Sequence, residues 1–308
     1  MSWETVLKIR EEIKKQSADN EYLLIHSSPS FMNHTSDLKK GSYTIEIILS
    51  EEKYNVSEAD MIITCSQPFC EKIKYIRQIP DHDRRIFDLY IPYVLLPHFA
   101  RKLKKTFVIT HFAQTLDGRI ASVTGDSKWI GNQQNLVHAH RMRALMDGII
   151  IGAKTLTIDN PKLTVRHVEG NNPCKILIGG DNLDISKFHM GRGKKIVFSQ
   201  NHQNTNQKRI RYQLEKKQKH YNTREILEIL FDLGIYSVYI EGGSITTSAF
   251  LNQRTIDQVQ IHFAPIILGS GITGFNFKGI HLLEEAIHFK SYRYRHVGDQ
   301  MMFIGELS

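Results

Sequence analysis

From about residue 105 onward, apolar runs alternate with amphipathic stretches. Runs rich in Val, Ile, Phe and Tyr predict strands, and apolar residues at helical spacing predict helices. The predicted strands are 107–112, 148–152, 175–178, 195–198, 236–240 and 258–264, and the predicted helices are 133–146, 223–233 and 244–252. This alternation is typical of a layered α/β domain around a mostly parallel sheet. Two late runs, 288–296 and 300–305, predict a C-terminal antiparallel hairpin.

The first 104 residues have a different pattern. Apolar residues recur at nearly helical spacing over 3–15, and short apolar runs at 22–25, 43–49 and 61–64 predict strands. We therefore expect two domains: a small accessory α/β region over 1–104, of unknown role, and a larger domain over 105–308. Pro80, Pro92 and Pro97 make 79–97 the expected linker or crossover.

Composition narrows the class of protein. Hydrophobic residues make up 41% of the chain and charged residues 23%, as in ordinary soluble globular proteins. A net charge of +8 favours anionic partners, such as a phosphorylated metabolite, a dinucleotide or nucleic acid. The basic residues are scattered, apart from Lys102, Lys104, Lys105 and a run over 208–219. Both groups fall between predicted elements, so we interpret them as solvated surface and expect no nucleic-acid partner.

The sequence lacks the segments and motifs that would place the protein in a membrane or a secretory route, or would bind zinc. No stretch of 18 apolar residues occurs, and the first 15 residues lack an apolar signal-peptide core, so we expect a cytoplasmic protein without a membrane partner. Three cysteines are too few for a disulfide framework or a four-cysteine zinc site, and we expect reduced thiols. Residues 1–104 contain neither the His-x-Glu nor the Pro-Cys-x-x-Cys of a zinc deaminase.

The strongest candidate for phosphate binding is the turn after the predicted strand 236–240. Glu241 is followed by Gly242, Gly243 and Ser244, where a helix is predicted to start. Glycines let backbone N–H groups approach a phosphate, and a helix N-terminus adds oriented donors and partial positive charge. A plain strand–turn–helix connection with a capping serine is the alternative that this motif alone leaves open.

A second glycine motif is weaker. Residues 269–274 fit Gly-x-Gly-x-x-Gly, but the following residues do not predict a helix and no βαβ unit surrounds them. A dinucleotide-binding turn requires both features. We therefore interpret 269–274 as a loop beside a ligand site or a flexible loop, and not as a Rossmann turn.

Two polar segments carry further candidates. Residues 115–121 contain an Asp-Gly turn, and residues 125–130 contain Trp129 in a polar turn. A tryptophan in a loop packs either into the core or against a flat ligand, and the sequence does not choose between them.

Arginines and histidines near the predicted helix 133–146 suggest an anion site and no metal site. Arg143 on this helix and Arg166 after the run 152–166 are two guanidiniums that could fork onto one phosphate, although each alone could equally form a surface ion pair. His138 and His140 are two residues apart, so they do not share a helix face as metal ligands would. No metal is expected.

Together, six ordered segments resemble one family. They are 113–121, 125–130, 140–144, 152–166, 241–243 and 264–269, and they cover about two-thirds of the chain. In order and spacing they resemble the reductase domain of the bacterial riboflavin-biosynthesis deaminase–reductase and its stand-alone relatives. The resemblance implies a dihydrofolate-reductase-like fold, NADPH as cofactor, a phosphorylated small-molecule substrate and a homodimer.

The resemblance also implies roles for single residues. The residues that match cofactor-contacting positions are Ala113, Trp129, Thr155, Asp159, Gly242, Gly243 and Ser244. The residues that match substrate-binding positions are Ser127, Arg143, Leu163 and Arg166. Glu241 is implied as the catalytic residue, which orients the sugar and assists proton transfer.

The sequence departs from the family in two places. Asn160 stands where the family often has aspartate, which removes one negative charge. Residues 1–104 are not the family's deaminase, so we expect no deaminating activity. Three hypotheses follow: reduction of a 5-amino-6-(5-phosphoribosylamino)uracil-type intermediate, reduction of a related substrate in a specialised pathway, or a non-catalytic protein that binds RNA.

Overall fold

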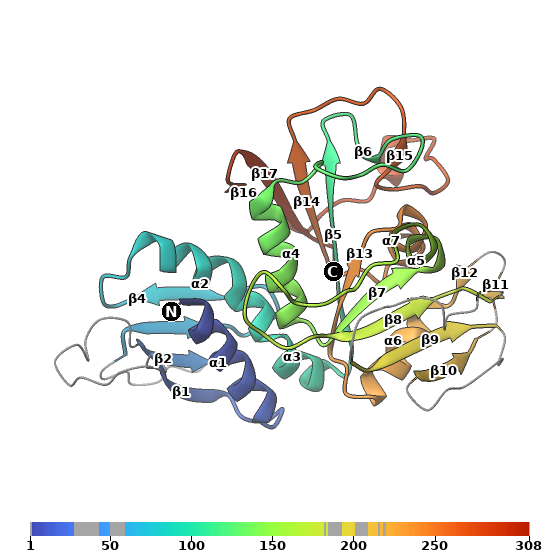
Figure 1. Ribbon diagram of the computed structural model, residues 1–308. Coiled ribbons are helices and arrows are strands. Elements are labelled where there is room, and N and C mark those ends of the chain that lie inside the picture. The colour runs from blue at the N-terminus through green and yellow to red at the C-terminus, as the bar shows by residue number, and fades with distance from the viewer. Residues whose placement is uncertain are drawn as a thin grey trace. The chain divides into compact units, whose positions relative to one another are not determined.

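The structure is a computed structural model that describes residues 2–27, 43–49, 59–181, 183, 193–200, 209–214, 216–217 and 220–307. The chain divides into two compact units, residues 1–105 and 106–308 (Figure 1). Among the described residues, no helix is both long enough and apolar enough to cross a bilayer.

The N-terminal unit is a four-stranded sheet with three helices. The sheet has the order β1 (Tyr22–Ser27), β2 (Tyr43–Ile48), β3 (Met61–Thr64) and β4 (Lys72–Tyr75), with only β2 and β3 parallel. Helix α1 (Ser2–Lys15) buries Trp3, Val6, Ile9 and Ile13, which lie at helical spacing on one face. The Trp3 ring meets Tyr90 of α2 (Asp81–Val94) edge-on, so α1 and α2 pack against each other.

The prediction of a linker over 79–97 is wrong. These residues form α2 and the start of α3 (Leu96–Leu103). Pro80 is the N-cap of α2 and Pro97 lies in the first turn of α3, where a helix loses no hydrogen bond to proline. Pro92 lies inside α2. The helix is held in place by the buried side chains around this proline, such as Tyr90, which pack in the apolar core of the N-terminal unit.

A nine-stranded sheet organises the C-terminal unit. Its order is β10 (Arg209–Gln213), β9 (Lys195–Ser199), β8 (Cys174–Ile178), β7 (Gly148–Gly152), β13 (Ser237–Glu241), β5 (Phe107–Thr115), β14 (Gln258–Ala264), β17 (Gln300–Glu306) and β16 (Ser291–Val297). Every pair from β10 to β14 is parallel, and β17 and β16 are antiparallel. The predicted α/β class, the mostly parallel sheet and the C-terminal hairpin are therefore confirmed.

Helices cover both faces of this sheet (Figure 1). One face packs on α6 (Thr223–Asp232) and α7 (Ser244–Asn252) through a large apolar core that includes Ile226, Leu230 and Phe250. The opposite face is covered by α4 (Gln133–Leu145) and α5 (Ala153–Asp159), and Leu156 of α5 joins a smaller apolar cluster there. Short pairs, β6 (Arg119–Ala121) with β15 (Ile272–Thr273) and β11 (Lys216–Lys217) with β12 (His220–Tyr221), and a 3-10 turn (Leu283–Glu285) complete the unit.

The basic run 208–219 was expected between elements, and this is wrong for the part that the structure describes. Residues 209–213 form β10, which pairs with β9 at the edge of the sheet, and 216–217 form β11. Charged residues are common on edge strands because one side of the strand faces water. Residues 208, 215, 218 and 219 lie outside the described residues.

Candidate active site

A pocket of about 1050 Å³ opens at the carboxyl ends of β7, β13 and β5. Ligands of parallel α/β sheets bind at this edge, because the loops that follow the strands converge there. The volume lies at the upper end of the range for small-molecule sites, roughly 300–1,000 Å³, and suits a ligand larger than one metabolite.

The pocket brings together most of the residues that the sequence singles out. Its walls include ten of them: Ala113, Ser127, Trp129, Thr155, Asp159, Leu163, Glu241, Gly242, Gly243 and Ser244. They come from five separate segments between residues 113 and 244. Arg143 and Arg166 are not among the lining residues.

The turn from β13 into α7 has the backbone that the two glycines permit. Gly242 and Gly243 have φ of 70° and 83°, in the left-handed region that favours glycine, and Gly243 is the N-cap of α7. The Ser244 hydroxyl is buried, and no described residue offers it a hydrogen-bond partner. It therefore remains available to a ligand at the helix N-terminus.

Two turns pack unusually closely beside this site. A Cβ on Gly152, at the end of β7, would lie 2.3 Å from Oγ1 of Thr246, and a Cβ on Gly243 would lie 2.9 Å from Oγ1 of Thr155. A Cβ at either position would force the threonine side chain or the backbone to shift, so the two glycines allow the β7–α5 and β13–α7 turns to lie close together.

Glu241 is held by Arg143. The Arg143 guanidinium donates from Nε to Oε1 (2.6 Å) and from Nη2 to Oε2 (2.5 Å) of Glu241, a two-pronged ion pair. The two side chains are only 11% and 15% exposed. Burial acts to lower the pKa of Arg143, but attraction to and hydrogen bonds with Glu241 outweigh it, so the pKa is raised. Arg143 also donates to the Thr164 carbonyl (3.0 Å), which fixes the guanidinium further.

Arg166 lies near this pair and is exposed. Its Nη1 donates to Oγ1 of Thr164 (2.8 Å), and its backbone N–H donates to Nδ1 of His140 (2.9 Å). Partial burial and then the neighbouring Arg143 lower the pKa of Arg166, because two guanidiniums lie close together. The neighbourhood therefore favours an added anion, while the clamp proposed for the two arginines stays a prediction.

Trp129 does not pack into the core. Its side chain is 89% exposed, it lines the pocket, and its φ of 72° is unusual for a residue other than glycine. Leu163, also on the pocket wall, has φ of 51°. Backbone strain of this kind clusters at ligand sites. Packing of Trp129 into the core is therefore wrong, and its contact with a flat ligand stays a prediction.

The rejection of a Rossmann turn at 269–274 is confirmed, although the segment is not loop throughout. Residues 272 and 273 form β15, which pairs with β6, and no helix follows within residues 274–280. A Cβ on Gly271 would lie 2.2 Å from the Ala121 carbonyl oxygen, so this glycine allows the two short strands to meet at the pocket wall.

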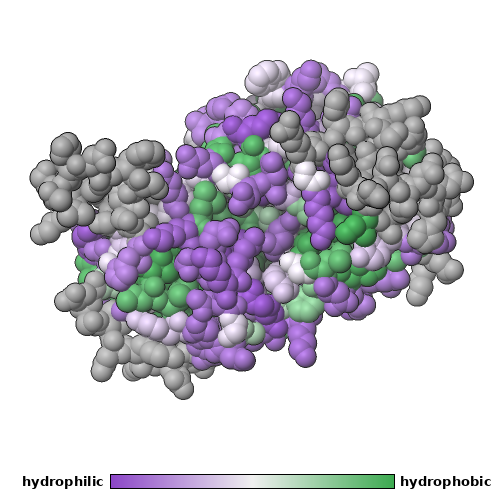
Figure 2. All heavy atoms as spheres, turned by 60° about the horizontal axis from the view of Figure 1, so that its bottom comes forward, coloured by the Kyte–Doolittle hydropathy of each residue, from purple (hydrophilic) through white to green (hydrophobic). Residues whose placement is uncertain are grey.

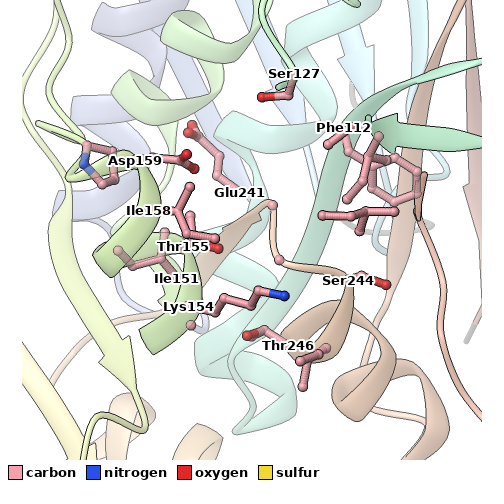
Figure 3. A pocket seen from close by; sticks show the side chains of 18 of the residues that line it. Phe112, Ser127, Ile151, Lys154, Thr155, Ile158, Asp159, Glu241, Ser244 and Thr246 are labelled. Carbon is pink, nitrogen blue, oxygen red and sulfur yellow. The ribbon is translucent and has the colours of Figure 1, made fainter. Parts of the chain in front are cut away.

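Sequence reasoning missed Lys154 and Thr246. Figure 3 shows Lys154, Thr155 and Asp159 of α5 on one side of the pocket, Ser244 and Thr246 of α7 on the other, and Glu241 between them. Lys154 is the second residue after a buried strand that ends in Gly152, and a cation at that position is the sequence signal that could have indicated the site.

The two histidines of α4 separate as expected. His138 Nε2 lies 2.9 Å from the side-chain oxygen of Gln260 on β14, whereas His140 accepts from Arg166. Burial, then Arg143, Arg166 and His167, lower the pKa of His140 to about 3, so it is neutral at physiological pH. Sequence reasoning did not foresee that His111 and His262, from β5 and β14, lie beside His138.

These features define a class of protein. A mostly parallel sheet with a deep pocket at its carboxyl edge, and a Gly-Gly turn onto a helix N-terminus, is an arrangement that binds nucleotides and phosphorylated metabolites. Within that class, the chain belongs to the RibD C-terminal domain family, which matches residues 106–303.

Three relatives describe the similarity. The chain is 31% identical over 188 residues to the riboflavin biosynthesis protein RibD of Corynebacterium ammoniagenes, covering 59% of this chain and 50% of that protein. It is 27% identical over 210 residues to the 2,5-diamino-6-ribosylamino-4(3H)-pyrimidinone 5′-phosphate reductase of Methanothermobacter thermautotrophicus, covering 64% of this chain and 96% of that protein. The crystal structure of Acinetobacter baumannii RibD is 16% identical with a TM-score of 0.63, covering 99% of this chain and 98% of that one.

The chain thus spans about half the length of the Corynebacterium relative. The family match begins at residue 106, and the likeness to the Acinetobacter protein, which shows fold alone, extends over the N-terminal unit. The riboflavin-biosynthesis reductase family is therefore shown for the C-terminal unit.

Proposed function

We propose that the chain is an NADPH-dependent reductase that converts the ribosyl group of a 5-amino-6-(5-phosphoribosylamino)uracil-type intermediate to ribityl, in riboflavin biosynthesis. The observation that carries the proposal is one pocket in which an anchored carboxylate, Glu241, directly precedes a turn suited to phosphate, residues 242–244. The names of the relatives in riboflavin biosynthesis support the choice of substrate class.

The residues fit a dinucleotide phosphate. The first N–H groups of α7 have no partner within the helix, the Ser244 hydroxyl is buried without a partner among the described residues, and Lys154 lies across from them (Figure 3). Trp129 offers an exposed ring at the pocket for stacking. When bound, NADPH supplies the hydride that reduces C1′ of the ring-opened imine form of the substrate.

The chain's own residues position the substrate. Ser127 and Arg166 hold the phosphate, and Leu163 packs against the substrate's apolar atoms. Glu241 orients the sugar and assists the transfer of a proton from solvent to the imine nitrogen, while Arg143 fixes the carboxylate by its two hydrogen bonds. No covalent nucleophile is required, because the imine carbon is already electrophilic.

The test is turnover with purified full-length chain. We expect oxidation of NADPH, with a ribitylamino product, when the deaminated phosphoribosylaminouracil is supplied. The diaminopyrimidinone form is assayed in parallel, because the Methanothermobacter relative is named for it. A folded chain that turns over neither compound would overturn the riboflavin-pathway assignment.

A second candidate keeps the cofactor and changes the substrate. The observation that favours it is the N-terminal unit, which lies outside the family match and lacks the deaminase signature. Complementation of a strain without its riboflavin reductase separates the two. Growth without added riboflavin supports the first candidate, and failure despite soluble expression supports the second.

The proposal includes a homodimer. Edge strand β16 exposes Tyr292 and Tyr294, whose rings pack with Phe303 of β17 into an aromatic surface. The face seen in Figure 2, which comes from the bottom of Figure 1, carries apolar patches of its own among hydrophilic residues. An exposed aromatic surface on an edge strand is a favoured site of association. Light scattering should give twice the chain mass, and Tyr294→Lys should give monomers; a monomeric wild type contradicts the proposal.

A further inference from the structure

Three buried histidines from different elements meet beneath α4. They are His111 of β5, His138 of α4 and His262 of β14, with side chains 5%, 2% and 0% exposed. The parallel register of β5 and β14 pairs His262 with Ala113, which lies two residues after His111. His111 and His262 therefore point to the same face of the sheet, the face that α4 covers.

Ring nitrogens of this cluster lack hydrogen-bond partners. Among the residues that the structure describes, none has hydrogen-bond geometry to Nε2 of His111 or to either ring nitrogen of His262, although the Asn135 side chain lies close enough to His111 to oppose the fall in its pKa. A buried polar atom without a partner is costly, and such atoms are rare unless an ion, a water or a ligand satisfies them. Two neighbouring histidines with this defect point to one shared occupant.

The spacing of the rings suits a metal ion. With Zn–N bonds of roughly 2.0–2.1 Å and tetrahedral angles, the centroids of three coordinating imidazoles lie about 5.2 Å apart. The observed centroid distances are 5.3 Å (His111–His138), 5.1 Å (His111–His262) and 5.5 Å (His138–His262). One ligand nitrogen from each residue lies within 4.8 Å of the others. In a tetrahedral site with such bonds the three nitrogens lie about 3.3 Å apart, so binding requires the rings to turn toward one another.

Charge also favours a cation of the zinc type. The three candidate ligands are buried imidazoles, and no carboxylate joins them among the described residues. Neutral imidazole suits Zn²⁺, Co²⁺, Ni²⁺ or Cu²⁺, whereas Mg²⁺ and Ca²⁺ require carboxylates. The positive charge of nearby Arg143 is balanced by Glu241.

We propose that His111, His138 and His262 bind one divalent transition-metal ion of the zinc type. Gln260 accepts a hydrogen bond from Nε2 of His138, the kind of contact that orients metal-ligating histidines. Because His111 also lines the pocket, the fourth position faces that side and takes a water. The ion ties α4 to β5 and β14 at the wall of the active site.

Titration of the metal-stripped full-length chain with Zn²⁺ and Co²⁺ tests the proposal without reference to turnover. We expect one equivalent bound, the intense visible absorption of tetrahedral Co²⁺, and a higher Tm with Zn²⁺. His262→Phe keeps a ring in the core, and should raise Kd at least about 100-fold, since even the loss of an orienting partner costs roughly 10–100-fold. His98→Phe is the matched control, because His98 is also buried with both ring nitrogens unpartnered.

The outcomes decide the proposal. Loss of the bound equivalent in His262→Phe with retention in His98→Phe supports it. No binding at micromolar Zn²⁺, or full binding by His262→Phe, overturns it, because other histidines would then hold the metal. If His262→Phe does not fold, X-ray absorption of the Co²⁺-loaded wild type decides: three imidazoles support the site, and fewer refute it.

Discussion

Replacing Arg143 with alanine separates two roles that this arginine could have. In the structure the guanidinium is bound to Glu241 by two hydrogen bonds of 2.6 and 2.5 Å and does not line the pocket. If it positions Glu241, then Arg143→Ala leaves a largely buried carboxylate without its partner. If it grips the substrate phosphate instead, the variant loses substrate affinity and little else.

The structure sets the magnitude for the first case. Breaking a buried ion pair from one side costs roughly 3–5 kcal/mol, and residual exposures of 11% and 15% place this pair near the lower end. We therefore expect Arg143→Ala to lose about 3 kcal/mol of stability, and at about 2–4 °C per kcal/mol to lose about 6–12 °C in Tm. Because Glu241 is no longer held, kcat should fall along with the rise in KM.

Matched variants make the result interpretable. Glu241→Gln in the Arg143→Ala background removes the stranded charge and should recover part of the Tm. Arg166→Ala removes an exposed guanidinium, so its stability should change by under about 1 kcal/mol. Its KM for substrate should rise about 10- to 150-fold, from a charged hydrogen bond of roughly 1.5–3 kcal/mol. An Arg143→Ala variant with wild-type Tm and only a raised KM would refute the positioning role.

Three further predictions concern other parts of the chain. Trp129→Ala should raise the KM for NADPH up to about tenfold, because stacking on the ring contributes roughly 0.5–1.5 kcal/mol, and Tm should not fall because the ring is exposed. Trp129→Phe should recover most of the lost NADPH affinity. Unchanged kinetics in Trp129→Ala would exclude stacking. Gly243→Ala should weaken NADPH binding and lower Tm more than Gly242→Ala, because only the first adds a Cβ close to Thr155; equal effects in the two variants would mean that positive φ alone matters. Burial, then nearby Lys102 and Arg101, lower the pKa of His98 to about 4, below the unfolded value of about 6.5. The unfolded state then binds the extra proton, so stability should fall as pH drops from about 6.5 to about 4. His98→Gln should flatten this dependence in pH-dependent thermal melts, and an unchanged slope would contradict the assignment.

The elements that the sequence predicts well are those in which pattern and packing agree. Strands 148–152 and 258–264 and helix 244–252 match the structure at both ends, because each is bounded by a residue that limits it, such as Gly152 or Gly243. The turn over 242–243 was also foreseeable, since two adjacent glycines between a strand and a helix indicate left-handed backbone.

The parts that the sequence did not predict depend on partners far away along the chain. From the local sequence alone, three prolines in 79–97 predict an interruption of secondary structure. In the structure, Pro80 and Pro97 lie at helix starts, and Pro92 is held inside α2 by packing. Arg143 and Glu241 are 98 residues apart, so nothing local shows that one binds the other. The three histidines likewise come from three elements, and a spacing rule applied to α4 alone could not bring them together.

The two faces of the large sheet differ in composition: one carries the apolar core, and the other places polar side chains beside the pocket. The face under α6 and α7 carries the large apolar core expected for a buried parallel sheet, with Thr110 as a polar exception that contacts Thr247 of α7. On the other face, β13, β5 and β14 place Tyr239, Glu241, His111, Gln260 and His262 beneath α4, where an apolar layer would pack more favourably. Buried polar groups are tolerated where their partners are supplied, and here α4 supplies Arg143 to Glu241 and His138 to Gln260. The helix that covers this face is therefore part of the site, and substitutions on its inner side should affect ligand binding as strongly as those in the glycine turn.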